Sequence, residues 1–165
     1  MTLYICTMKI ITTSTLSGQQ KQAALNIWNA EYPVRLLMPG MNEFDTFINP
    51  LINPKHYLLI NEPDEIVGWA ATFSVETARC FFIMLSGSIH GKGYGSLLLN
   101  ELKKDETQLF GWAIDHDTDI KANGEPYPSP INFYHKNGFT INTDLRLENE
   151  QLSAVNILWN AETGQ

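Results

Sequence analysis

A glycine-spaced loop in the middle of the chain is the stretch best suited to chemistry. Residues 90–95 read His-Gly-Lys-Gly-Tyr-Gly, after a short apolar run at 81–85 and before apolar residues at helical spacing. Backbone N–H groups at a helix start have no partner within the helix and carry partial positive charge, and glycines let an anion approach them closely. The stretch therefore predicts a strand, a phosphate-binding loop and a helix N-terminus, with Lys92 adding a full positive charge.

The spacing of these glycines differs from two well-known phosphate motifs. A Walker loop ends in Gly-Lys-Ser/Thr, and no lysine stands between Gly95 and Ser96. The dinucleotide fingerprint, Gly-x-Gly-x-x-Gly, opens a βαβ unit, whereas here the glycines alternate far into the chain. An ordinary tight turn between a strand and a helix is the alternative to a phosphate site.

Elements that would position this loop are predicted along the whole chain. Ser17 is expected to cap a helix that Pro33 stops, and Ser129-Pro130 to start a helix that Gly138 ends. Together the elements predict one α/β (α+β) domain over 1–165, with a central mixed, splayed sheet of about seven strands and about four helices. The strands are expected at 3–13, 56–60, 66–75, 79–86, 108–114, 139–147 and 152–159, and further helices near 41–49 and 93–105.

Composition narrows the class of protein. Eleven Lys and Arg against eighteen Asp and Glu give a net charge of −7, which argues against nucleic-acid binding. No apolar run is long enough to cross a membrane, and the N-terminus does not read as a signal peptide, with Met1 or Met8 as the natural start. Two cysteines, Cys6 and Cys80, predict neither a disulfide framework nor a metal site. A cytoplasmic protein with reduced, buried cysteines is expected.

Taken with a second segment, the loop resembles a known family. Residues 133–139 read Phe-Tyr-His-Lys-Asn-Gly-Phe, a helix ending about forty residues after the loop. The loop, this ending and the order of elements resemble the GNAT superfamily of acetyl-CoA-dependent N-acetyltransferases. Two positions depart from its pattern: His90 stands where the family loop usually opens with Gln or Arg, and Tyr127 where the family helix often carries Asn.

The resemblance implies acetyl-CoA as co-substrate and no metal. Its pyrophosphate would bind the N–H groups of residues 91–96, and its pantetheine arm would pair with strand 81–86 where two central strands splay apart. Lys92 or Lys136 would meet a phosphate, and a solvated surface role is the alternative for either lysine. The residues expected to bind the coenzyme are Met84, Leu85, Ser86, His90, Gly91, Lys92, Gly93, Tyr94, Gly95, Ser96, Asn132 and Lys136.

The resemblance also implies catalytic roles. A backbone N–H near Leu85 would stabilise the oxyanion, and Tyr134 would act as general acid, because a tyrosine with a pKa of about 10 is protonated at neutral pH. His116 and Asp115, directly after the strand at 108–114, are the candidate general bases. Glu76 and Glu43 are rivals, and deprotonation through a water chain is the alternative to any single base.

The function expected is acetyl transfer to a primary amine. Acidic residues within 115–119, together with Glu125, favour a small cationic acceptor. The alternatives are a protein amine as acceptor, a non-catalytic acyl-CoA sensor, and a nucleotide-binding domain. The apolar N-terminal strand and the edge of the closing hairpin would permit a homodimer.

Overall fold

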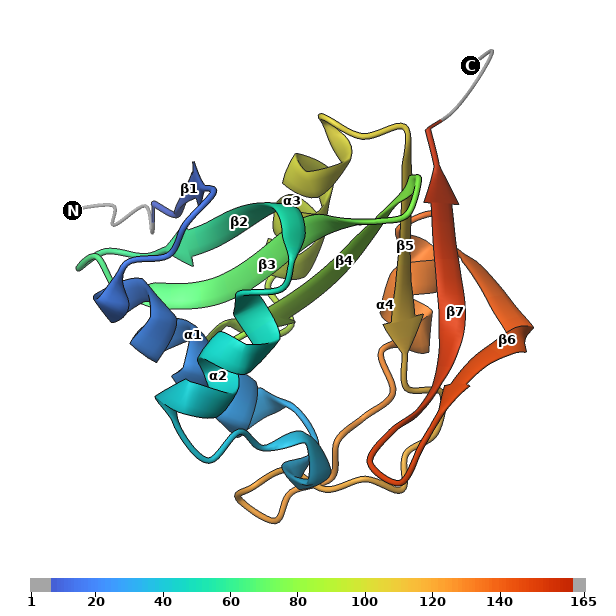
Figure 1. The fold of residues 1–165 in the computed structure, drawn as a ribbon. Helices are drawn as coiled ribbons and strands as arrows, with labels where there is room; N and C mark the ends of the chain where they lie inside the picture. Colours follow the sequence, from blue (N-terminus) through green and yellow to red (C-terminus); the bar gives the residue numbers. More distant parts are fainter. Residues whose placement is uncertain (1–6, 162–165) are drawn as a thin grey trace, which may run out of the picture.

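Seven strands join into one mixed sheet in the computed structural model, which describes residues 7–161 (Figure 1). The strand order is β1-β2-β3-β4-β5-β7-β6, and every neighbouring pair is antiparallel except β4 and β5. The strands are β1 (Lys9–Thr13), β2 (Ile52–Ile60), β3 (Ile66–Val75), β4 (Ala78–Leu85), β5 (Gln108–Ala113), β6 (Thr140–Glu148) and β7 (Ser153–Asn160). The helices are α1 (Gly18–Glu31), α2 (Met41–Ile48), α3 (Tyr94–Lys103) and α4 (Ile131–Lys136), with 3-10 turns η1 (Val34–Leu36) and η2 (Gly87–Ile89).

These elements confirm the predicted α/β fold with a seven-stranded mixed sheet and four helices. The first strand was expected over 3–13 and spans Lys9–Thr13 in the structure, and positions 3–6 lie outside the described residues. Cys6 lies outside the described residues. Cys80 is buried in β4, and burial raises the pKa of its thiol to about 12, so the thiol stays protonated and unreactive at neutral pH.

Capping side chains predicted the start of one helix correctly and misplaced the start of another. At α1, Ser17 is the N-cap as predicted: its hydroxyl accepts from the N–H of Gln20, whose side chain accepts from the N–H of Ser17. At α4, the N-cap is Pro130 and not the predicted Ser129. The Ser129 hydroxyl instead donates to the carbonyl of Ile114 at 2.6 Å, so it ties the helix start to the end of β5.

The helices form a layer on each face of the sheet (Figure 1). Helices α1 and α2 pack on one face and bury Trp28 and Phe44 against Trp69 of β3. Helices α3 and α4 pack on the other, where Leu98 and Tyr134 meet Phe81 of β4. Successive residues of β4 therefore serve opposite cores, as the two-residue period of a strand requires. The middle of the sheet is held rigidly from both sides.

Strands β4 and β5 part after a short contact, as the sequence predicted. Their parallel register contains the single pair Cys80 and Phe110. Gly111 permits this approach, because a Cβ there would lie 2.8 Å from the Phe81 ring. Beyond that point β5 pairs only with β7 on its other side. The sheet thus opens between the C-terminal ends of β4 and β5, where the cleft described below begins. None of the described helices has the length and apolar character needed to span a membrane.

Candidate active site

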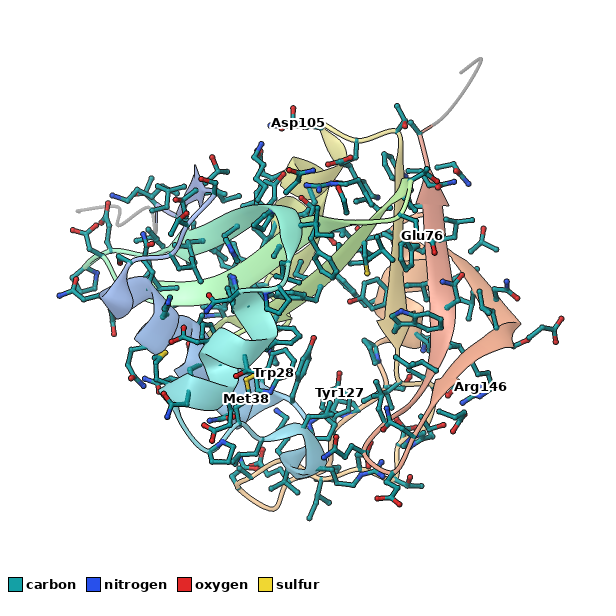
Figure 2. All side chains as sticks on the ribbon, in the orientation of Figure 1. Trp28, Met38, Glu76, Asp105, Tyr127 and Arg146 are labelled. Carbon is teal, nitrogen blue, oxygen red and sulfur yellow. The ribbon has the colours of Figure 1, made fainter. Side chains whose placement is uncertain are left out.

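A cleft of about 900 Å³ occupies the opening between the two halves of the sheet. Its walls come from the end of α1, from η1 and α2, from the loop before α3, from α4, and from the turn between β6 and β7. Figure 2 shows Trp28 and Tyr127 beside the gap that separates α1 and α2 from β5 and β7. The segment between β5 and α4 closes one side, because the N–H of Val34 in η1 donates to the carbonyl of Ile120.

One wall of the cleft is the free backbone edge of β4. The N–H of Ser86 donates to the carbonyl of Val67, and hydrogen-bonded pairs alternate along an antiparallel ladder. The backbone groups of Ile83 and Leu85 therefore point away from β3, toward the splay. The carbonyl of Leu85 is bound by the ring of His90, whose Nε2 lies 2.8 Å away. His90, expected to contact the coenzyme, thus caps the end of this edge.

The glycine loop at the other end of the cleft has the features of an anion site. Gly91 and Gly93 have positive φ angles of 75° and 86°, and a Cβ on either would stand in open space. Gly93 is the N-cap of α3 and offers no side-chain acceptor, so the first N–H groups of the helix are left without a capping partner. Gly91, Gly93 and Ser96 line the cleft. A phosphate group fits this cradle.

Not every residue expected at the coenzyme lies in the cleft lining. Met84, Leu85, His90 and the loop residues Gly91, Gly93, Tyr94, Gly95 and Ser96 do. Four others do not: Ser86, Lys92, Asn132 and Lys136. Lys92 and Lys136 are exposed, as expected for the alternative that they are solvated surface lysines. Asn132 is exposed on α4. Contact between these four and a bound coenzyme stays a prediction.

Tyr134 lies in the cleft lining on α4. Its ring packs edge-on to Phe81, Phe133 and Phe139, with centroids 5.2–5.9 Å away. Burial, followed by the neighbouring phenol of Tyr127, raises the pKa of Tyr134 well above its ordinary value. The hydroxyl therefore keeps its proton at neutral pH, and no side chain among the described residues takes it as a hydrogen bond.

Two further tyrosines converge on the same space. Tyr32 follows α1, and Tyr127 comes from the segment before α4, with their ring centroids 6.4 Å apart. Burial raises the pKa of both phenols, that of Tyr127 to about 12. Sequence reasoning noted Tyr127 only as a departure from a family pattern and missed Tyr32. Its one sequence signal is its place at the end of the first helix, immediately before Pro33.

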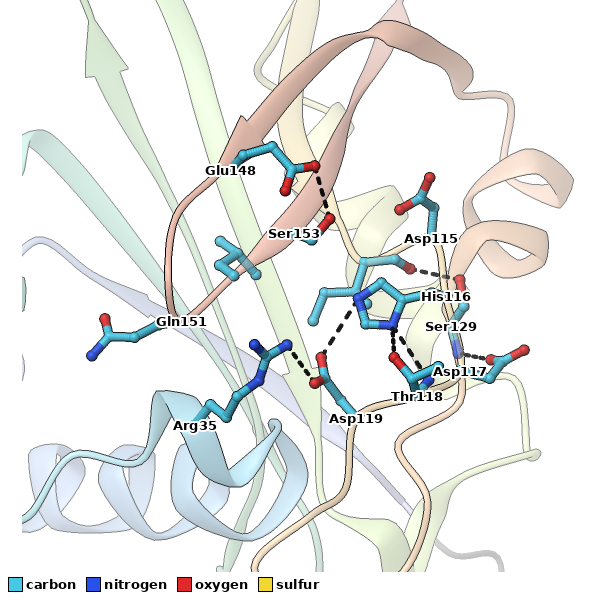
Figure 3. Close-up of polar contacts among 12 residues, drawn as sticks. Arg35, Asp115, His116, Asp117, Thr118, Asp119, Ser129, Glu148, Gln151 and Ser153 are labelled. Carbon is cyan, nitrogen blue, oxygen red and sulfur yellow. Dashed lines mark hydrogen bonds and ion pairs between the residues drawn. The ribbon is translucent and has the colours of Figure 1, made fainter.

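The acidic residues after β5 were expected near the acceptor, but none of them belongs to the cleft lining. Figure 3 shows one of their pairings, that of Asp119 with Arg35. Asp115 accepts two hydrogen bonds from Arg146 of β6, at 2.9 and 3.0 Å, and this guanidinium lowers the pKa of Asp115. Asp117 accepts from the N–H of Ser129, and the buried Asp119 pairs with Arg35. The carboxylate of Asp115 is therefore held by a cation and lies outside the cleft lining, and its role as general base stays a prediction.

His116 is engaged in the same segment. Its Nδ1 lies 2.8 Å from the hydroxyl of Thr118 and accepts from the N–H of that residue, while its Nε2 lies 3.8 Å from Asp119 (Figure 3). It does not belong to the cleft lining. Both nitrogens therefore face protein partners, and the role of His116 as general base stays a prediction. The rival Glu76 is exposed at the turn between β3 and β4, also outside the lining.

Charged side chains that do line the cleft are mostly paired. Glu31, at the end of α1, accepts from the N–H of Gly87 at 2.8 Å and from the ammonium of Lys121 at 3.2 Å. Arg35 is paired with Asp119. Glu43, in the first turn of α2, lines the cleft without an ion pair among the described residues. Of the carboxylates weighed from the sequence, Glu43 alone belongs to the cleft lining.

No group of three or more His, Cys, Asp or Glu within residues 7–161 is arranged to hold a metal ion. The arrangement can bind a phosphate at the start of α3, an extended chain along the edge of β4, and a small molecule in the cleft whose lining includes the phenols and Glu43. This is the geometry that transfer between a phosphorylated carrier and a second substrate requires.

Comparison with known proteins gives one family. A protein-family model described as "Acetyltransferase (GNAT) domain" matches residues 53–141, more than half of the chain. This match includes β2 to α4 and both the glycine loop and Tyr134. No curated protein matches the chain in sequence.

Solved structures with this fold cover nearly the whole chain. An acetyltransferase of the GNAT family from Staphylococcus aureus Mu50 has a TM-score of 0.66 and 15% identity, over 94% of this chain and 100% of its own. A phosphinothricin acetyltransferase from Sinorhizobium meliloti, in complex with AcCoA, has a TM-score of 0.60 and 15% identity, over 94% and 88%. A spermidine N-acetyltransferase from Vibrio cholerae has a TM-score of 0.61 and 11% identity, over 93% of each chain.

Proposed function

The chain belongs to the GNAT acetyltransferase family, and we propose that it transfers the acetyl group of acetyl-CoA to the primary amine of a small cationic acceptor, with Tyr134 as general acid. The observation that carries the proposal is the cleft itself. It places a protonated phenol, a free strand edge and an uncapped helix N-terminus around one space of about 900 Å³.

The donor half of the cleft fits an acyl-coenzyme A. Gly91 and Gly93 leave room for the pyrophosphate at the start of α3, and the N–H groups there supply the hydrogen bonds. The backbone N–H and carbonyl of Ile83 and the N–H of Leu85 are free to pair with an extended amide chain, as a neighbouring strand would. The N–H of Leu85 also lies on the cleft side of β4, where it can stabilise a developing oxyanion. Acetyl-CoA supplies the activated acetyl group.

Tyr134 supplies the proton that the leaving thiolate needs. The amine nitrogen forms the new C–N bond while the C–S bond breaks, and the phenol proton passes to the sulfur. The phenolate regains a proton from the product nitrogen, which must lose one to become an amide. Burial makes Tyr134 a weaker acid, but the same surroundings raise the pKa of a thiol, so donor and acceptor remain matched.

Glu43 and the net charge of −7 favour a protonated amine as the incoming acceptor. The amine must be neutral to attack, and its first proton leaves to solvent through the open side of the cleft. This role for Glu43 is attraction and orientation, which requires charge alone. It replaces the acidic segment at 115–119, whose carboxylates are engaged elsewhere.

The test is a pair of phenol-to-phenyl substitutions. In Tyr134→Phe we expect kcat to fall by roughly a hundredfold or more, because a positioned acid contributes that much, while the Kd for acetyl-CoA is unchanged. Tyr57→Phe is the matched control, since Tyr57 is buried in β2 outside the cleft lining. Thiol release with a panel of amines measures kcat, and calorimetry measures the Kd. An unchanged kcat in Tyr134→Phe removes this residue from the mechanism.

A further inference from the structure

Six aromatic side chains contribute to the lining of the cleft. They come from separate parts of the chain, and all belong to the cleft lining. This aromatic wall consists of Trp28 (α1), Tyr32 (after α1), Phe47 (α2), Phe73 (β3), Phe82 (β4) and Tyr127 (before α4). All but Trp28 are only partly buried, so apolar ring surface remains open to the cleft. An exposed apolar concavity of this kind is a site for an apolar ligand.

The rings are fixed in place by one another. Trp28 stands 4.6 Å from Tyr32, 5.0 Å from Phe47 and 6.4 Å from Phe82 between ring centroids, and Phe47 stands 5.7 Å from Phe82. The indole N–H of Trp28 donates to the carbonyl of Leu36 at 2.7 Å, which locks the ring and removes its polar group from the cleft. The aromatic wall is therefore organised before any ligand arrives, which lowers the entropic cost of binding.

One unpaired charge stands beside the aromatic wall. Glu43 and Phe47 are four residues apart on α2, so they lie on the same face of the helix, and both line the cleft. The lining cations are neutralised: Arg35 pairs with Asp119, and Lys121 with Glu31. A ligand here meets one carboxylate and a set of rings, and no free cation among the described residues of the lining.

We propose that the acceptor is an arylalkylamine, a primary amine linked by a short chain to a single aromatic ring. The inference rests on the proposed function, since it names the amine that the same cleft acetylates. The ring would lie against the aromatic wall, and the ammonium would meet Glu43 before deprotonation. Edge-to-face contacts favour an aromatic ring over an aliphatic one of the same size.

Two other classes of amine fit less well. A polyamine presents a second ammonium where the aromatic wall stands, and the carboxylates that would have received it are bound to Arg146 and Arg35. An amino acid presents a carboxylate, which finds its cations already paired. The volume adds a limit, because about 900 Å³ must also hold the acyl end of the coenzyme, so the acceptor is small.

The experiment uses four amines that differ in one feature each. 2-Phenylethylamine carries the ring, ethylamine lacks it, putrescine replaces it with a second aminoethyl group, and L-phenylalanine adds a carboxylate. Thiol release from acetyl-CoA gives kcat/KM for each, and calorimetry with CoA present gives the Kd of 2-phenylethylamine. We expect kcat/KM for 2-phenylethylamine to exceed that for ethylamine by roughly tenfold to a hundredfold, the effect of burying one aromatic ring. Putrescine and L-phenylalanine should fall below it.

Three variants locate the effect. Phe47→Leu keeps an apolar side chain but removes one ring, and should reduce the 2-phenylethylamine to ethylamine ratio several-fold. Glu43→Gln should lower kcat/KM for both amines together and leave that ratio unchanged. Leu145→Ala, at an exposed position of β6 outside the cleft lining, is the control and should change neither.

The outcomes separate this inference from the proposed function. Acetylation of putrescine or ethylamine in preference to 2-phenylethylamine overturns the arylalkylamine and leaves acetyl transfer intact. Failure of 2-phenylethylamine to bind, with CoA present, also overturns it. Binding that Phe47→Leu weakens, without thiol release from any amine, supports the aromatic wall as the ligand site and overturns catalysis.

Discussion

The buried histidine of β2 makes the fold sensitive to acid. His56 is 1% exposed, and its Nδ1 accepts a hydrogen bond from the indole N–H of Trp69 at 3.2 Å. Burial lowers its pKa from 6.5 to about 4. Because a buried imidazolium lacks solvent and has no ion-pair partner among residues 7–161, the native state holds His56 neutral. Protonation is therefore coupled to unfolding.

The sign and size of the coupling follow from the two pKa values. Between pH 6.5 and 4 the unfolded chain binds a proton that the folded chain does not, so stability falls as pH falls through this window. Each pKa unit corresponds to about 1.4 kcal/mol, so the full loss is about 3 kcal/mol, complete below pH 4. That is a large share of the roughly 5–15 kcal/mol typical of a domain.

Denaturant unfolding at pH 7.0, 5.5 and 4.5 measures this loss. The carboxylates whose pKa is lowered, such as Asp115, add their own loss only when pH falls below about 4, so the upper window isolates the histidine. His56→Asn is the matched control, because its amide oxygen can accept from Trp69 and does not titrate. A wild-type free energy of unfolding that stays level from pH 7.0 to 4.5, or that falls equally in His56→Asn, would refute the reasoning.

Two further predictions concern the cleft. In Gly93→Val the valine must adopt a φ of +86°, and its side chain enters the space where the phosphate would bind, so we expect the Kd for acetyl-CoA to rise at least tenfold. Gly124→Val is the control, because Gly124 has the same φ and the same open space but lies outside the cleft lining. This control should lose stability without losing affinity for acetyl-CoA. In Asp115→Asn we expect kcat and its pH profile to match those of the wild type, because Arg146 already holds that carboxylate. A large fall in kcat would contradict this and support Asp115 as the general base.

The sequence predicted the donor half of the cleft because its chemistry is local. A glycine loop between a strand and a helix contains its own anion site, since the N–H groups, the positive φ angles and the helix start all lie within about ten residues. The positions of the strands along the chain followed from turn residues and apolar runs in the same way. The α4 N-cap was misplaced by one residue because Ser129 had a stronger partner in Ile114, at a distance in sequence that no capping rule covers.

The acceptor half could not be predicted, because its charges are settled over long sequence separations. Asp115 is paired with a residue 31 positions away, and Asp119 with one 84 positions away. In the sequence, both carboxylates were part of the acidic segment that favoured a cationic acceptor. In the structure they join β6 and η1 to the segment before α4, and they shape the cleft without facing its contents.

One feature of the acceptor half is nevertheless local, namely the pairing of a charge and a ring on one helix face. Glu43 and Phe47 stand one helical turn apart, a spacing that the sequence itself shows. Its role in binding depends on Trp28 of α1 and Phe82 of β4, because their rings pack beside Phe47 and make it part of the aromatic wall. Neighbours with the same fold include enzymes named for spermidine and for phosphinothricin, so the fold does not choose the acceptor. The choice lies in which charges are left unpaired, and among the described residues of this cleft that is Glu43 beside a set of rings.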